Sequence, residues 1–109
     1  MIIKKKNDGV YVKYDISENH LSFKDGELEF DLEKEQCGYD VRLVVSEDES
    51  GKLTLGSSRR YIAEIDIPKR QSRISRTDFV DQAGIDELIR VVDPFDIEKV
   101  TLTLWAIEE

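Results

Sequence analysis

The sequence predicts a mostly β fold: an antiparallel sheet or two-sheet sandwich of about 6–7 strands, with one short helix near 85–92. Several segments alternate apolar and polar residues, as strands with one buried face do. An Asp-Gly pair separates two of these segments, which is typical of a tight hairpin. A single stretch has apolar residues at helical spacing, so an α+β fold is also compatible with the pattern.

The predicted strands differ in how clearly their boundaries are marked. The best-defined turn is Asp25-Gly26, because both central positions of such a turn need a positive φ. Pro68 ends another strand, since proline has no N–H to donate to a neighbouring strand. The predicted strands cover 10–16, 21–23, 27–33, 39–46, 52–55, 60–67 and 100–107.

The stretch after Pro68 changes character twice. Residues 69–76 contain almost nothing apolar, which predicts a solvated basic loop or a mobile arm. Further on, apolar residues at i, i+3, i+4 and i+7 predict a helix that Asp93-Pro94 would end. This helix could cover the apolar residues that lie on otherwise polar strand faces; alternatively, it connects two sheets of a sandwich. Those residues are Val44, Ile62, Trp105 and Ile107.

Length and composition indicate one domain spanning 1–109 with a highly charged surface. Of its 109 residues, 39% are hydrophobic and 37% are charged, and the net charge is −8. A strongly acidic chain is unsuited to holding nucleic acid by its global charge. The one cysteine allows no internal disulfide, and the chain has neither a secretory leader pattern nor a long apolar stretch. We therefore expect a cytoplasmic protein without a membrane segment.

Residues suited to catalysis are few. The only histidine, His20, is expected on an outward strand face, and Cys37 lies among carboxylates that would raise its thiol pKa. The acidic stretches lack the ligand spacing of a calcium loop, and the six glycines are too dispersed to form a phosphate-binding loop. The sequence therefore predicts no enzyme, no catalytic residues, no cofactor and no metal site.

Charge is segregated along the chain. From Asp15 to Glu49, twelve acidic residues face three basic ones, a net charge of −9. From Arg59 to Arg76, six basic residues face two acidic ones, a net charge of +4. The candidate partner-binding residues are Glu27, Glu29, Asp31, Glu33, Arg59, Arg60, Lys69, Arg70, Arg73 and Arg76.

The four acidic candidates form a row if 27–33 is one strand, spaced by roughly 6.8 Å on one face. Such a row resembles the phosphates of a nucleic acid; it also fits the solvated face of an edge strand protected from aggregation. The basic candidates could contact phosphates or a partner's carboxylates, or only offset the acidic excess. No aromatic residue lies between 69 and 76, so base stacking there is not expected.

These observations favour a small non-enzymatic intracellular module that contacts a macromolecular partner through charged sheet edges and the basic loop. One alternative is an acidic nucleic-acid mimic that inhibits a DNA- or RNA-binding protein. Another is an enzyme or ligand-binding domain built on converging carboxylates. The expected partner is a protein, and a basic protein is the narrower form of this expectation. Direct nucleic-acid binding through 69–76 is disfavoured but left open, and a homodimer fits the exposed strand edges.

Overall fold

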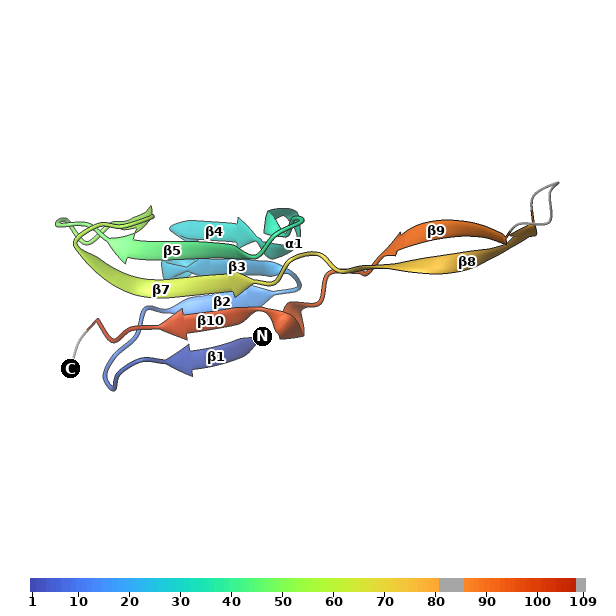
Figure 1. The fold of residues 1–109 in the computed structure, drawn as a ribbon. Coiled ribbons are helices and arrows are strands. Elements are labelled where there is room, and N and C mark those ends of the chain that lie inside the picture. Colours follow the sequence, from blue (N-terminus) through green and yellow to red (C-terminus); the bar gives the residue numbers. More distant parts are fainter. Residues whose placement is uncertain (81–85, 108–109) are drawn as a thin grey trace.

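The computed structural model describes residues 1–80 and 86–107, with the backbone alone for 75–80 and 86–90. It contains a five-stranded sheet, a three-stranded sheet and a two-stranded ribbon (Figure 1). The mostly β fold class is thereby confirmed. None of its helices is long and apolar enough to cross a membrane, as far as the described residues go.

The five-stranded sheet has the order β1-β10-β7-β5-β6. All its neighbouring strands are antiparallel except β1 and β10, which run parallel. This edge is the parallel exception in an otherwise antiparallel sheet, and its strand β1 was not predicted from the sequence. The strands are β1 (Ile2–Lys5), β5 (Val41–Glu47), β6 (Leu53–Leu55), β7 (Arg60–Ile67) and β10 (Thr101–Leu104).

The three-stranded sheet is an antiparallel meander, β2-β3-β4, packed on one face of the larger sheet (Figure 1). Its first and last strands are shorter than predicted, since 10–13 is not part of the first one and the last one stops at Asp31. The elements of this part are β2 (Tyr14–Ser17), β3 (His20–Phe23), the 3-10 turn η1 (Lys24–Gly26), β4 (Leu28–Asp31) and the one-turn helix α1 (Leu32–Glu35).

The hairpin between β3 and β4 is confirmed. Phe23 pairs with Leu28 on either side of the turn, and Asp25 and Gly26 have φ angles of 56° and 98°. Glycine takes such positive φ values at no steric cost, and aspartate tolerates them better than most residues. The Asp-Gly pair therefore positions β4 against β3 as the sequence pattern predicts.

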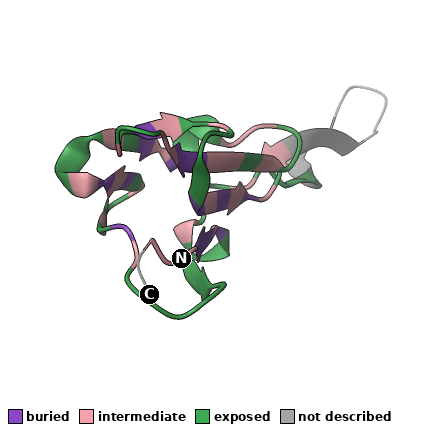
Figure 2. Cartoon of the chain, turned by 90° about the vertical axis from the view of Figure 1, so that its left-hand side faces the viewer, coloured by how far each residue is buried: buried purple, intermediate pink, exposed green. Residues whose placement is uncertain are grey.

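One hydrophobic core lies between the two sheets, so the body is a two-sheet sandwich (Figure 2). In β3, β4 and the second half of β7, alternate residues turn toward this core, so the period-two patterns of the sequence correspond to burial there. From the small sheet, Leu21, Phe23 and Phe30 are buried; from the large sheet, so are Val45, Ile65 and Leu102. Phe23 and Phe30 meet edge to face with ring centroids 6.4 Å apart.

The ribbon consists of β8 (Ser72–Val80) and β9 (Asp86–Val92), which pair antiparallel. The helix predicted near 85–92 is wrong: 86–92 is a strand, and Ile85 lies outside the described residues. The loop predicted over 69–76 is also wrong from Ser72 onward. The 3-10 turn η2 (Ile97–Lys99) then leads into β10.

The ribbon makes the molecule elongated. It projects from one end of the sandwich, and the principal extents are 68, 22 and 21 Å (Figure 1). The Cα radius of gyration is 19.3 Å, whereas a compact domain of this length has a value of about 13 Å. The protein is thus a compact body carrying an arm.

Truncating the core at Phe23 should strongly destabilise the body. Phe23→Ala removes a fully buried ring and leaves a cavity beside Phe30, which should lower the free energy of unfolding by about 3–5 kcal/mol in urea denaturation. Tyr39→Ala is the control, since Tyr39 is 71% exposed and should change stability by less than about 0.5 kcal/mol. Equal losses for both variants would contradict this description of the core.

Candidate interaction surfaces

The ribbon, 72–80 with 86–92, is the first candidate surface. Its strands pair from Ser72 with Val92 to Arg76 with Leu88, and Asp93 N donates to Gln71 O at 2.8 Å just below them. Two aliphatic side chains on it are in contact with solvent: Ile74 is 69% exposed and Val92 is 53% exposed. Because an isolated two-stranded ribbon is only marginally stable in water, these exposed groups suggest a surface that a partner covers.

Hydrogen bonds hold residues 69–71, the root of the ribbon, against the body. Arg70 N donates to Cys37 O at 2.8 Å, and Lys69 N donates to Asp40 Oδ1 at 2.8 Å. The guanidinium of Arg70 also donates to Gln36 O, at 3.0 Å. Two candidate residues, Lys69 and Arg70, therefore help to fix where the ribbon leaves the body.

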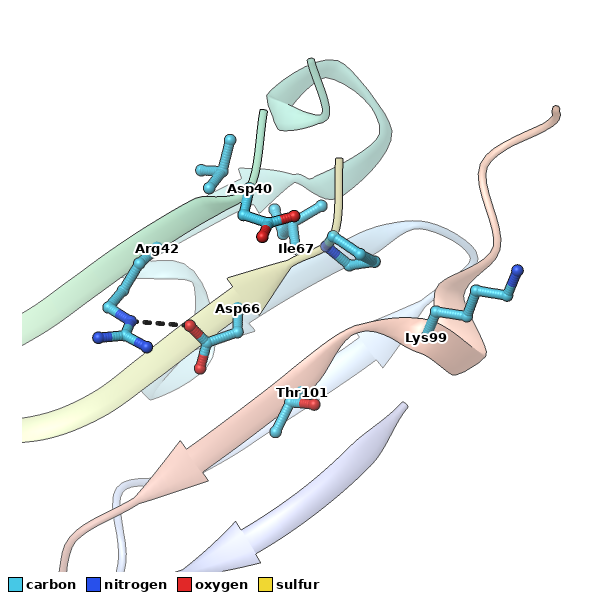
Figure 3. Close-up of a pocket in the computed structure, with 8 residues that line it drawn as sticks. Asp40, Arg42, Asp66, Ile67, Lys99 and Thr101 are labelled. Atoms are coloured by element: carbon cyan, nitrogen blue, oxygen red, sulfur yellow. Dashed lines mark hydrogen bonds and ion pairs between the residues drawn. The ribbon is translucent and has the colours of Figure 1, made fainter. Parts of the chain in front are cut away.

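A surface hollow of about 470 Å³ lies beside this root, lined by residues of β5, β7 and β10 and by the segments next to them (Figure 3). Arg42 occupies it, with Nε 2.9 Å from Asp66 Oδ1 and 3.4 Å from Glu64 Oε1. The hydrogen bond to Asp66, followed by the charges of Asp66 and Glu64, raises the pKa of Arg42 above its ordinary value. The Arg42 guanidinium is already engaged by two carboxylates, so it is poorly suited to binding an anion in this hollow.

The four acidic candidates do not form the predicted row. Glu29 and Asp31 belong to β4, but Glu27 lies in the turn before it and Glu33 lies in α1. Asp31 ends the strand because its Oδ1 accepts a hydrogen bond from Lys34 N at 3.3 Å and so caps the helix. Because β4 is an edge strand, the remaining charges fit the protection of an exposed edge.

The outward face of the small sheet brings Ser17, His20 and Asp31 into one cross-strand row. His20 Nε2 lies 3.8 Å from Asp31 Oδ2, too far for a hydrogen bond, and the His20 side chain is exposed. Catalysis by such a row would require a base in hydrogen-bond contact and a site that excludes water. The arrangement therefore gives no support to a nucleophilic site. Cys37, half-buried, has its Sγ 3.6 Å from Tyr39 O.

The basic candidates divide between two ends of the body. Arg59 and Arg60 lie at the start of β7, and Lys69 follows its other end; an eight-residue strand spans roughly 26 Å. Arg60 Nη2 is bound to Glu47 Oε1 at 2.7 Å, and its Nη1 donates to Ile107 O at 3.0 Å. The basic segment of the sequence is therefore not one surface. Arg73 and Arg76 belong to β8.

Arg59 lines a separate hollow with a tight acidic turn, Asp48 to Lys52. Asp48 Oδ1 accepts hydrogen bonds from Ser50 Oγ at 2.7 Å, from Ser50 N at 2.9 Å and from Lys52 N at 2.9 Å. These bonds, that of the Ser50 hydroxyl first, lower the pKa of Asp48 below its ordinary value. The carboxylate is thus committed to shaping the turn.

Among the described side chains, those of residues 1–74 and 91–107, no three of histidine, cysteine, aspartate or glutamate are grouped so that they could hold a metal ion. No protein-family model matches the chain, and no curated protein or solved structure is similar to it. The geometry is therefore the basis for any functional proposal. The candidate residues fall into three groups: the acidic edge of the small sheet, Arg60 paired with Glu47 at one end of the body, and the ribbon with its root at the other end of the body.

The β8–β9 ribbon was not predicted from the sequence. Val91 and Val92 are β-branched and favour a strand, but their neighbours also fit helical spacing. The sequence reasoning also missed Gln36 and Asp40, which hold the root through bonds across about thirty residues of sequence. No local sequence pattern predicts such contacts.

The Asp48 carboxyl should titrate below its ordinary pKa of 3.8. Because the folded-state pKa is depressed, the stabilisation of the turn is present above the ordinary value and lost as the pH falls through the folded-state pKa. Carboxyl-carbon NMR titration measures this directly. Ser50→Ala should move the pKa of Asp48 upward, whereas Ser58→Ala, in the same hollow, should leave it in place; equal effects of the two variants would contradict this assignment.

Proposed function

We propose that this protein is a non-enzymatic interaction module whose β8–β9 ribbon binds a protein partner. The observation that carries the proposal is a projecting two-stranded ribbon with exposed Ile74 and Val92. Two strands alone gain little stability in water, whereas a third strand or a packed surface completes the sheet. Binding a partner along this ribbon would provide that completion.

The anchored root supports the same proposal. The hydrogen bonds of Lys69 and Arg70 to the body hold the first residues of the ribbon in a defined direction. A binding element that is already oriented loses less conformational entropy when it meets its partner. The strongly charged body, meanwhile, keeps the protein dispersed while the ribbon is presented.

A photo-crosslinking amino acid placed in the ribbon should capture this partner in cells that produce the protein. Substituted at position 74 and, separately, at position 92, it should yield an adduct with the same protein, because Ile74 and Val92 lie on paired strands. Leu55 is the matched control, an aliphatic residue 58% exposed on β6 of the body. Absence of adducts from both ribbon positions, or identical adducts from position 55, would refute the proposal.

A further inference from the structure

We infer that the protein partner of the ribbon is a second copy of this chain, joined to the first along the outer edge of β8. This inference rests on the proposed function and makes it specific. Within the described part of the chain, β8 pairs with β9 alone, so its other edge is open to another strand. Pairing two such edges would give one four-stranded sheet, β9-β8-β8-β9, in place of two marginal ribbons.

Hydrogen bonding at the root shows which backbone groups of β8 face outward. Asp93 N donates to Gln71 O, so these two residues form a hydrogen-bonded pair. Hydrogen-bonded and non-hydrogen-bonded pairs alternate along an antiparallel ladder. The N–H and C=O groups of Ser72, Ile74 and Arg76 consequently point away from β9 and toward the open edge.

The middle of β8 is only partly paired with β9. Arg76 pairs with Leu88 and Val80 pairs with Asp86, so three residues of β8, 77–79, lie opposite the single residue Glu87 of β9. Because β8 has two extra residues here, an even number, inward- and outward-pointing backbone groups continue to alternate in the same order. The N–H and C=O groups of Val80 therefore point toward the open edge, as those of Ile74 and Arg76 do. Backbone groups in this bulge have too few partners in β9 and are available to a new strand.

The sequence of β8 is complementary to itself when it is reversed about Thr77. Antiparallel pairing of two copies about this residue places Thr77 opposite Thr77, and Ser75 opposite Phe79. It also places Arg76 opposite Asp78 and Ile74 opposite Val80, each twice because the pairing is twofold. Opposite charges and Thr–Thr pairs that face each other across strands stabilise the pairing.

Neighbouring registers and the other edge are less favourable. Moving the twofold axis by one residue places either Arg76 or Asp78 opposite its own copy, which sets like charges against each other. On β9, pairing about Leu88 would match Asp86 with Arg90 but would set Glu87 against Ile89. The edge of β8 and its register about Thr77 are therefore the best matched.

The arm also keeps the acidic bodies apart. Each chain carries a net charge of −8, and the ribbon extends from one end of a molecule 68 Å long. Two ribbons that pair antiparallel leave their bodies at opposite ends of the new sheet. Because repulsion is screened beyond about 8–10 Å at physiological salt, the bodies need not oppose the association.

Charge exchange at two positions tests this register. Light scattering of the unaltered chain should give twice the monomer mass of 12.6 kDa. Arg76→Asp and Asp78→Arg should each weaken the dimer by about tenfold or more, because like charges then face each other. Mixing the two variants should restore a dimer, since both charge pairs become attractive again. Loss of association that mixing fails to restore would overturn the inference.

A disulfide test locates the edge. In a Cys37→Ser background, Thr77→Cys should form a disulfide-linked dimer on oxidation, because facing residues of a non-hydrogen-bonded pair lie about 4.5 Å apart at Cα. Leu88→Cys in the same background is the matched control on β9. Efficient linkage through position 88 but not 77 would overturn the assignment to β8.

The two proposals fail in different ways. If the chain is a monomer in light scattering while positions 74 and 92 crosslink to another protein, the second-copy inference is refuted and the binding role of the ribbon stands. If those positions crosslink to nothing, both are refuted. Adducts at position 74, on β8, with twice the mass of one chain, together with rescue of the dimer by mixing, support both.

Discussion

Burial of one face of the five-stranded sheet by the three-stranded sheet is the constraint on which the rest of the structure depends. Neither sheet alone removes enough apolar surface from water, and together they enclose one core around Phe23, Ile65 and Leu102. Strands such as β3 and β7 therefore have a buried side and a solvated side. Charged residues are concentrated on the solvated side, which is why an extremely polar composition is compatible with a stable sandwich.

The central strand β7 links this core to the ribbon. It pairs with β5 on one side and with β10 on the other, so its direction is fixed along its whole length. Pro68 ends it, and the chain continues into the ribbon through residues that bond to Gln36, Cys37 and Asp40. The direction of the ribbon is consequently determined by the central strand of the larger sheet.

The sequence predicted the body better than the arm, for physical reasons. Alternation reports burial on one face, so strands such as 60–67 and the Asp25-Gly26 hairpin were predictable. In the ribbon, the pattern near 85–92 matched a helix although its β-branched residues favour a strand. Among the candidate sites, Glu33 is not in a row with Glu29 because Asp31 caps the helix that contains Glu33. Arg60 and Lys69 lie at opposite ends of β7, and a count of charges along the sequence does not show this separation.

The pairing of β7 with β10 has a consequence for how this chain can vary. Thr101 and Asp66 are register partners on neighbouring strands. The residues between them, the ribbon included, therefore form one long connection between β7 and β10. The entropy cost of closing such a connection depends only weakly on its length. Lengthening, shortening or exchanging the ribbon should therefore leave the sandwich folded, which makes the body a scaffold on which recognition elements of different reach could be exchanged.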